Sequence, residues 1–155
     1  MNKCANSSTG CGLNISNIAI EKSLIIIKPD GVHDRVTGKI ISRFEDAGFT
    51  IEKMKMMEID EGLAKSHYRD HVEKDFFGPL LKYITSGPVI VMVISGEDAI
   101  GQTRKLMGPT DSRKASKGTI RGDFGKDVTI NVIHGSDSAE SAVREIGLFF
   151  GGGDQ

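Results

Sequence analysis

The sequence predicts an α+β fold in which helices cover a four-stranded antiparallel sheet. Only four segments have a convincing strand pattern: residues 23–29, 49–59, 88–95 and 127–134. Helical patterns separate them, in the order strand, helix, strand, helices, strand, helix, loop, strand, helix. This order fits a ferredoxin-like split βαβ sandwich better than a doubly wound parallel sheet, which would need more strands.

The elements of the first half follow from their apolar patterns. Residues 23–29, SLIIIKP, are a continuous apolar run closed by proline, which is typical of a buried strand. The next segment, residues 36–48, is predicted to be a helix that stops at Gly48. Its apolar residues at helical spacing are Ile40, Ile41, Phe44 and Ala47. Residues 49–59 then alternate in polarity, and we expect a break in this strand near Lys53.

The second half repeats this alternation of helices and strands. Residues 61–87 predict one or two helices ended by a Gly-Pro pair, and residues 88–95 predict an apolar strand. A short helix over 96–108 leads into a polar loop, residues 109–125, whose length implies a function in a compact domain. A strand over 127–134 follows. The final helix has an apolar stripe formed by Ala139, Ala142, Val143, Ile146 and Phe149.

The composition narrows the class of partner. The chain has 155 residues, 38% hydrophobic and 26% charged, with a formal net charge of −1, which is typical of one globular domain. This near-neutral balance gives no reason to expect nucleic acid as the main substrate or a membrane surface as a partner. No apolar run approaches the ~20 residues of a membrane span. A small, locally positive pocket for an anionic ligand remains compatible with these numbers.

The N-terminal segment differs in composition from the rest. Residues 1–20 are polar and lack the apolar stretch of a secretory signal, so we expect a disordered leader followed by one domain over residues 21–155. Cys4 and Cys11 both lie in this leader and the predicted core contains no cysteine. This pattern fits a reducing compartment, and we expect the protein to be cytoplasmic.

The segment NVIHGSDSAESAVREI, residues 131–146, is the most informative for chemistry. A histidine at a strand end is usually a packing residue, but His134 is followed by Gly135, which permits a tight turn, and by a predicted helix start. Asp137 and Glu140 have the spacing of a capping box. Because the free N–H groups of a helix start favour an anion, this pattern predicts a nucleophilic imidazole beside a phosphate site.

Cationic residues support the same interpretation. The region around Thr110 and Thr119 is rich in them: Arg104, Lys105, Arg113, Lys114, Lys117 and Arg121. They are either solvated surface charges or a phosphate clamp of guanidinium groups. Lys28 directly follows a buried strand, and we expect its ammonium to emerge at one end of the sheet with a functional role.

Two other candidate motifs, a phosphate-binding loop and a metal site, are not supported by the sequence. GVHDRVTGKI does not match a Walker A loop, because its glycines are too widely spaced and Ile40 stands where a hydroxyl is required. His67 and His71 have i, i+4 spacing, which could hold a metal ion from one helix face. Since no third histidine or cysteine joins them, the interpretation is a surface helix.

Five segments together resemble the nucleoside diphosphate kinase family: IIIKPDGV, HYRDH, FFGPLLKYITSGPV, GTIRGDFG and NVIHGSDSAESAVREIGLFF. The resemblance is colinear from about Glu21 to Phe150. It implies a ping-pong reaction in which a nucleoside triphosphate gives its γ-phosphoryl group to His134, and the phosphohistidine passes it to a nucleoside diphosphate. The partners implied are nucleoside di- and triphosphates.

The resemblance also implies roles for individual residues. Among the catalytic ones, Lys28 contacts the transferring phosphate, the Tyr68 hydroxyl approaches the histidine, and Glu145 orients the second nitrogen of His134, with Ser136 hydrogen-bonded nearby. Nucleotide-binding roles fall on Lys28, Phe76, Leu80, Arg104, Thr110, Arg121, Val128 and Asn131. In this set Phe76 stacks on the base, Leu80 and Val128 line the same face, and Asn131 binds the ribose. Mg²⁺ is the expected cofactor and is carried by the nucleotide phosphates, without metal-ligating side chains.

Two questions stay open at this point. The family implies a homo-oligomer, but Ser112 and Lys117 stand where many relatives have prolines that support trimer contacts, and the chain stops at Gln155 without a long tail. The sequence therefore leaves two alternatives for the oligomeric state, a hexamer and a tetramer. The alternatives to an enzyme are a catalytically silent nucleotide-binding or scaffold member of the family, and a regulatory nucleotide sensor of the same fold. The presence of every matched site residue favours the enzyme.

Overall fold

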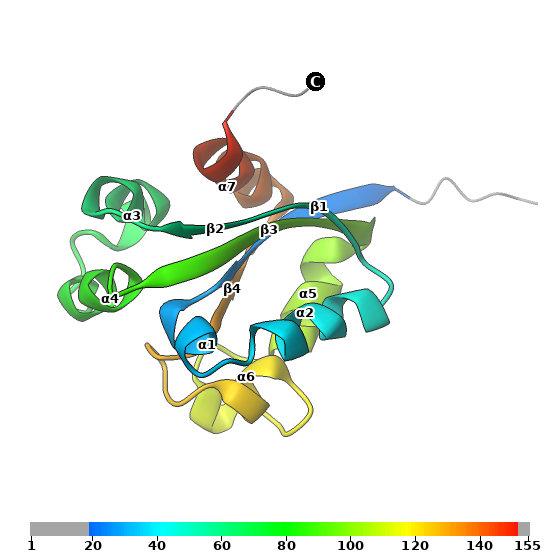
Figure 1. The fold of residues 1–155 in the computed structure, drawn as a ribbon. Coiled ribbons are helices and arrows are strands. Elements are labelled where there is room, and N and C mark those ends of the chain that lie inside the picture. Colours follow the sequence, from blue (N-terminus) through cyan, green and yellow to red (C-terminus); the bar gives the residue numbers. More distant parts are fainter. Residues whose placement is uncertain (1–18, 152–155) are drawn as a thin grey trace, which may run out of the picture.

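The computed structural model describes residues 19–151, and Figure 1 shows the chain as one sheet with helices on both faces. The sheet has four strands in the order β2-β3-β1-β4, and every pair is antiparallel. Their bounds are β1 Ile20–Ile27, β2 Thr50–Glu58, β3 Pro88–Glu97 and β4 Ile133–Gly135. The predicted fold class, a four-stranded antiparallel sheet covered by helices, is confirmed.

Seven α-helices and two short 3₁₀ turns surround this sheet within the described residues. The helices are α1 Pro29–His33, α2 Thr37–Asp46, α3 Glu61–His67, α4 Phe77–Ile84, α5 Ala99–Met107, α6 Ile120–Phe124 and α7 Ala139–Phe150. The 3₁₀ turns are η1 Arg69–His71 and η2 Ser112–Lys114. Two of the helices were not predicted. Helix α1 starts at Pro29, where proline's fixed φ suits a first helical turn, and α6 lies inside the segment expected to be a loop.

The sheet separates two hydrophobic cores. On one face Ile25 and Ile27 of β1 pack against α2, α5 and α6, and on the other Leu24 and Ile26 pack against α3, α4 and α7. Figure 1 shows α3 and α7 on one side of the sheet and α2, α5 and α6 on the other. All four residues are completely buried, as expected for a central strand covered on both faces. This explains why the run LIII is apolar without alternation.

Strand β2 forms one edge of the sheet and alternates between exposed and half-buried residues. Its register with β3 shifts between Ile51 and Lys53, so the predicted break near Lys53 is confirmed as a bulge. Strand β4, at the other edge, has only three residues, and the prediction of a strand over 127–134 is wrong for its first part. There the backbone N–H groups of Thr129 and Ile130 donate to the Asp127 side chain, both at 2.7 Å, instead of to a neighbouring strand.

The final helix buries a narrower stripe than predicted. Ala142 and Phe149 are buried and Ile146 is half-buried, but Ala139 is exposed and Val143 is 76% exposed, so the assignment of these two residues to the stripe is wrong. The buried face of α7 also includes a charged residue, Glu145. A carboxylate replaces an aliphatic side chain there, which points to a role other than packing.

The expected leader, residues 1–20, lies outside the described residues apart from its last two, and Ile20 opens β1. Within the described part of the chain, no helix combines the length and the apolar character needed to cross a membrane.

Candidate active site

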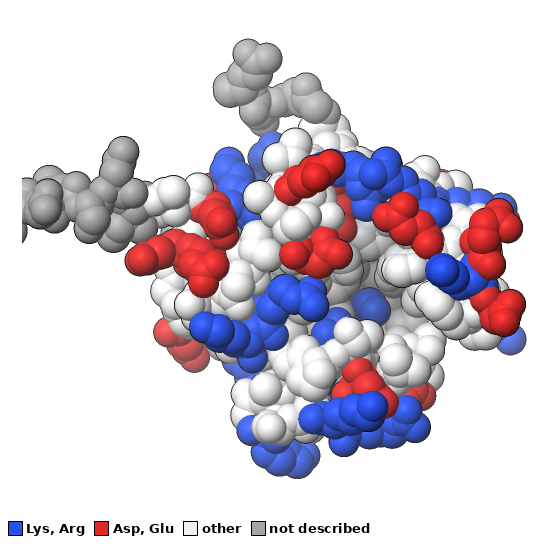
Figure 2. Space-filling view, turned by 180° about the vertical axis from the view of Figure 1, so that it is seen from behind, with Lys and Arg blue, Asp and Glu red and all other residues white. Residues whose placement is uncertain are grey.

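A cavity of about 550 Å³ opens between α3, α4, α5 and α7 and the segment that connects α5 to β4. Seen from the side opposite to Figure 1, the surface is hollowed, and Lys and Arg side chains lie at the rim and inside the hollow (Figure 2). The predicted site residues that line the cavity are Lys28, Tyr68, Phe76, Leu80, Arg104, Thr110, Arg121, Val128, Asn131, His134 and Glu145. Ser136 lies behind this lining and is fully buried.

His134, on β4, is held by a buried carboxylate. Its Nε2 lies 2.9 Å from Oε2 of Glu145, which is 4% exposed. Ser136 donates to the same oxygen at 2.8 Å, and its hydroxyl oxygen accepts from the Leu24 N–H at 3.0 Å. Because a carboxylate only accepts hydrogen bonds, Nε2 carries the ring proton. Nδ1 therefore keeps its lone pair, and no hydrogen bond to Nδ1 is present among residues 19–151.

The backbone just before His134 has an unusual conformation. Val132 has a φ of +69°, which a β-branched residue rarely adopts. The Ile133 N–H donates to the Asn131 carbonyl at 2.9 Å, so the chain makes a three-residue turn centred on Val132. The Lys28 N–H donates to the Val132 carbonyl at 2.9 Å and fixes this turn to the end of β1. As a result, Asn131 and His134 both line the cavity.

The start of α7 confirms a helix N-terminus after Gly135 but corrects its cap. Ser138 is the N-cap residue, and its hydroxyl accepts from the Ser141 N–H at 3.0 Å. The predicted capping box of Asp137 and Glu140 is therefore wrong. The Asp137 carboxylate is instead hydrogen-bonded to the Ser141 side chain, which lowers its pKa. The cap sets the direction of α7 and, with it, the position of Glu145 further along the helix.

Lys28, at the end of β1, is 6% exposed and donates to Oδ1 of Asn131 at 2.7 Å. Its ammonium emerges into the cavity, and not into open solvent at the end of the sheet. Burial, followed by the positive charge of Arg121, lowers the pKa of Lys28 from 10.5 to about 7. A lysine in this state gains most from an anion, because an anion restores the charged form.

Arg121, on α6, supplies a second buried cation, and it is 7% exposed. It donates to the Gly108 carbonyl at 3.1 Å and to the Ile133 carbonyl at 2.8 Å, while its Nε has no partner in the described structure. Burial and the nearby Arg104 lower the pKa of Arg121 to about 10. Thr110 contributes its backbone, since its carbonyl accepts from Nδ2 of Asn131 at 2.9 Å. The cavity is therefore positively charged at its base.

The mouth of the cavity is apolar. Phe76 is 50% exposed and Val128 is 51% exposed, while Leu80 is buried beside them. Exposed aromatic and aliphatic groups at the mouth of a cationic cavity suit a ligand with one flat apolar part and one anionic part.

Tyr68 and His67 form a packed pair behind His134. The Tyr68 hydroxyl is buried without a partner within residues 19–151, and its burial, followed by the charge of Glu145, raises its pKa. The His67 ring is 5% exposed and meets the His134 ring edge-on, with centroids 4.6 Å apart and planes at 81°. The interpretation of His67 as a surface residue is wrong. Helix α3 ends at His67, so the i, i+4 pairing with His71 does not hold.

Several residues of the cavity lining were not predicted as part of the site, and two of them contact its other members: His67 and Arg144. Arg144 donates to the carbonyls of Ser66 and His67, at 3.2 and 3.4 Å, and so joins α7 to the end of α3. The one available signal for His67 was its place beside Tyr68 in HYRDH. Nothing in the sequence singles out Arg144, because it is one of many helix-surface arginines until α3 is placed next to it.

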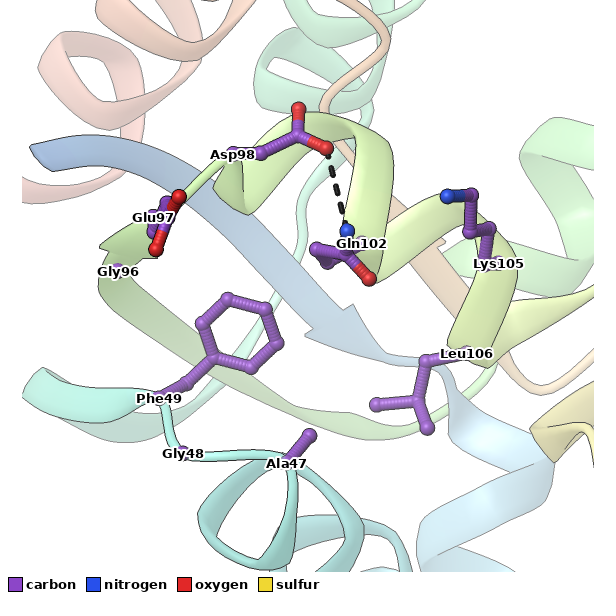
Figure 3. Close-up of a pocket in the computed structure, with 9 residues that line it drawn as sticks. All are labelled: Ala47, Gly48, Phe49, Gly96, Glu97, Asp98, Gln102, Lys105 and Leu106. Atoms are coloured by element: carbon purple, nitrogen blue, oxygen red, sulfur yellow. Dashed lines mark hydrogen bonds between the residues drawn. The ribbon is translucent and has the colours of Figure 1, made fainter. Parts of the chain in front are cut away.

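A larger cavity of about 790 Å³ lies apart from His134, around Phe49 and the start of α5 (Figure 3). Lys105 is its one basic residue, and its lining contains no histidine. Asp98 in this lining is the residue at the start of α5, and its carboxylate accepts a hydrogen bond from the Gln102 side chain at 3.3 Å. Size therefore does not identify the active site in this molecule. The smaller cavity holds the titratable groups with shifted pKa values.

The sequence matches a family of known function. The family description "Nucleoside diphosphate kinase" matches residues 21–154. A nucleoside diphosphate kinase of Methanobrevibacter smithii is 56% identical over 131 residues, which cover 84% of this chain and 87% of that protein. One from Rubrobacter xylanophilus is 52% identical over 133 residues, 86% of this chain and 100% of that protein.

Solved structures are similar as well. A nucleoside diphosphate kinase from Aquifex aeolicus superimposes with a TM-score of 0.83 at 44% identity, covering 86% of this chain and 97% of that one. The enzyme from Halobacterium salinarum, solved in complex with CDP, has a TM-score of 0.83 at 48% identity, covering 85% and 88%.

The fold and these matches define a phosphotransferase that acts on nucleotides. Within that class, the chain belongs to the nucleoside diphosphate kinase family. Its substrates are nucleoside tri- and diphosphates, and its fold is the α+β fold of that family.

Proposed function

We propose that His134 is the residue that carries the phosphoryl group between the two nucleotides. The observation that supports this is the hydrogen bond from its Nε2 to Glu145 at 2.9 Å, which leaves the Nδ1 lone pair for attack. Nδ1 bonds to the γ-phosphorus while the bond from phosphorus to the bridging oxygen breaks, and the diphosphate leaves. A terminal oxygen of the second diphosphate then takes the group from Nδ1. Glu145 stabilises the positive ring during both steps, with Ser136 fixing the carboxylate.

The cations supply the rest of the catalysis. Phosphoryl transfer depends mainly on in-line positioning and on stabilising charge on the equatorial oxygens. Lys28, Arg104 and Arg121 surround the phosphate part of the cavity, and the unpartnered Nε of Arg121 is a ready donor to an oxyanion. The buried Tyr68 hydroxyl is a further donor without a partner in the described chain. Thr110 joins Arg104 and Arg121 in the clamp on the diphosphate, and Asn131 binds the ribose.

The nucleoside would occupy the apolar mouth. Phe76 stacks on the base, with Leu80 and Val128 lining the same face, and stacking tolerates every base. A CDP complex of the Halobacterium salinarum relative supports a nucleotide in this cleft.

Mg²⁺ is part of this proposal as a companion of the nucleotide. The buried carboxylate of the cavity, Glu145, is occupied by His134 and Ser136, and the other carboxylates of the lining, Asp70 and Asp137, are exposed. The side chains therefore do not form a magnesium cage. They fit an ion that takes its ligands from phosphate oxygens and water, where it would neutralise charge on the transferring group.

Three further properties belong to the same proposal. We expect a cytoplasmic location, in keeping with cysteines confined to positions 4 and 11, and a domain over residues 21–155 preceded by a leader. We also expect a homo-oligomer, either hexamer or tetramer. The exposed Met54 and Met56 on the edge strand β2 support an interface there.

The deciding experiment uses γ-labelled ATP and Mg²⁺ without acceptor, quenched in base. Label should remain on the protein in alkali, be lost in acid, map to His134 and move to added GDP. His134→Ala should take no label and lose exchange, while its nucleotide Kd stays within about tenfold, or ~1.4 kcal/mol. Substantial exchange in that variant would refute the assignment. No label on folded, ATP-binding wild-type protein would favour the catalytically silent alternative.

A further inference from the structure

Three residues that line the cavity have the arrangement of a metal site. His67, His134 and Glu145 each offer one ligand atom, and these atoms all lie within 4.8 Å of one another. The residues come from α3, β4 and α7, so tertiary packing alone brings them together. The separation of His134 Nε2 and Glu145 Oε2 is 2.9 Å, and none of the three separations exceeds 4.8 Å. Ligand atoms on a tetrahedral ion with bonds of ~2.1 Å lie about 3.4 Å apart, so small side-chain movements would bring the three atoms to this spacing.

His67 is the independent observation that points to a ligand. Both of its ring nitrogens are buried, and neither has a hydrogen-bond partner in the described structure. Buried polar atoms without partners are uncommon in proteins. A neutral imidazole has one nitrogen with a lone pair, and no donor among the described residues binds it here.

We propose that His67, His134 and Glu145 bind one transition-metal ion of the Zn²⁺ or Cu²⁺ kind, and that this ion blocks phosphoryl transfer. Imidazole nitrogen suits these metals, whereas Mg²⁺ prefers oxygen and a nearly ideal octahedron. The magnesium that accompanies the nucleotide is thus a poor competitor. Ser136 and Arg144 support the ligands from outside, through the carboxylate of Glu145 and the carbonyl of His67.

The ion takes the place of the proton shared by His134 and Glu145. Binding at Nε2 releases that proton and withdraws electron density from the ring, and it also removes the carboxylate that would stabilise the phosphorylated form. Inhibition rests on the proposed role of His134, but binding does not, so the two can be tested separately.

Binding is measured first, on the full chain with Cys4→Ser and Cys11→Ser, because free thiols would bind the same metals. Zn²⁺ affinity is determined by competition with a chromophoric chelator, and Co²⁺ serves as a spectroscopic probe of tetrahedral geometry. We expect one ion per chain, with release of a proton. Loss of a residue that only supports a metal ligand lowers metal affinity by about 10–100-fold. His67→Phe and Glu145→Gln should each lower the Zn²⁺ affinity by more than this.

His71→Phe is the matched control, since it removes a histidine from the same segment without touching the cluster. Its Zn²⁺ affinity should equal that of the parent. Equal losses in His67→Phe and His71→Phe would assign the ion to those two histidines and overturn the proposal. Absence of stoichiometric Zn²⁺ binding in the parent, or full affinity in both His67→Phe and Glu145→Gln, would also overturn it. Circular dichroism checks that each variant is folded. If His67→Phe does not fold, the Zn²⁺ affinity of Glu145→Gln tests the proposal.

Inhibition is then tested by phosphorylation with labelled ATP at a buffered free Zn²⁺ concentration. Labelling of the parent should fall as the site fills, and labelling of His67→Phe should not depend on Zn²⁺. Parent protein that fills with Zn²⁺ and still labels fully would refute the inhibitory role. Parent protein that never labels, with or without metal, would instead contradict the proposed function and leave the metal site standing.

Discussion

The environment of Lys28 differs strongly from that of a lysine side chain in water. Lys28 is almost fully buried, close to the second buried cation Arg121, and within the described residues its side chain hydrogen-bonds to the neutral oxygen of Asn131, while the charge of Asp30 offsets only part of the shift in its pKa. Burying an ammonium group without a carboxylate partner costs free energy unless the group loses its proton. This free-energy cost arises at the place where the phosphates of a nucleotide would bind, and their negative charge would offset it.

This environment predicts how stability depends on pH. The pKa of Lys28 is about 7 in the folded protein, whereas in the unfolded chain it has the ordinary lysine value of 10.5. Between these values the unfolded chain binds more protons, so the free energy of unfolding should rise with pH, by at most about 1.4 kcal/mol per pH unit. Below pH 7 both states are charged and this contribution is flat. Guanidinium titrations from pH 6 to pH 9.5 should show the rise in the wild type.

Lys28→Met is the test variant and Lys39→Met, at an exposed position, is the control. The rise should disappear in Lys28→Met and persist in Lys39→Met. A rise of the same size in Lys28→Met would assign it to another group.

Phe76 carries the expected base contact. Because it is half-exposed at the mouth of the cavity, Phe76→Ala should weaken ADP binding without disturbing the core, by about 1–3 kcal/mol if the base stacks on the ring. Isothermal titration with ADP measures this directly. Val143→Ala, at an exposed position outside the cavity lining, should leave the Kd unchanged. An unchanged Kd in Phe76→Ala would remove its stacking role.

At the scale of elements, α7 shows why a cap matters for the site. Ser138 starts the helix, and Glu145 lies two turns further on, against His134. Loss of the cap would fray the first turn of this helix. The start of the helix was predicted from the run of small polar residues, but which of them caps it depends on backbone geometry that the pattern does not contain.

Ser138→Ala should lower the free energy of unfolding by about 1 kcal/mol, within a range of about 0.5–2 kcal/mol, because it removes the acceptor for the Ser141 N–H. Glu140→Ala should change it by less than about 0.5 kcal/mol, since its carboxylate does not cap the helix. Urea denaturation of both variants compares them under the same conditions. If Glu140→Ala lowered the free energy of unfolding as much as Ser138→Ala, the capping box would be supported after all.

At the scale of the whole molecule, the two edge strands of the sheet differ in length and in role. Strand β4 is short and carries His134, so its edge belongs to the active site. Strand β2 is long, and it exposes Met54 and Met56, which are 54% and 61% accessible. A long edge strand with exposed apolar side chains favours association with another chain.

The mass of the native protein tests this interface. Light scattering should give a multiple of the 16.7 kDa chain, matching a tetramer or a hexamer. A double variant, Met54→Lys and Met56→Lys, should give a smaller particle because it places like charges on the edge strand. Val143→Lys, away from this edge, should keep the native mass. A native mass of one chain would contradict the proposed oligomer, and an unchanged mass in the double variant would move the interface elsewhere.

The sequence by itself determined the fold class, the central strands and the bulge near Lys53, and it singled out His134, Lys28 and the cationic residues as candidates for a phosphate site. It could do so because these features depend on local patterns: apolar runs, alternation, and motifs of neighbouring residues. The family resemblance supplied the other site residues and the expected role of each.

Only the tertiary structure decided the surroundings of those residues. The shortness of β4, the burial of His67 and the support from Arg144 arise where segments far apart in the chain meet, as when α3 packs against α7. His67 and His71 lie four residues apart in one segment, yet His67 is buried and His71 is exposed, and packing decides the difference. For the same reason the cluster of His67, His134 and Glu145 could not be predicted from sequence spacing, since its three members lie on three elements that the fold alone brings together.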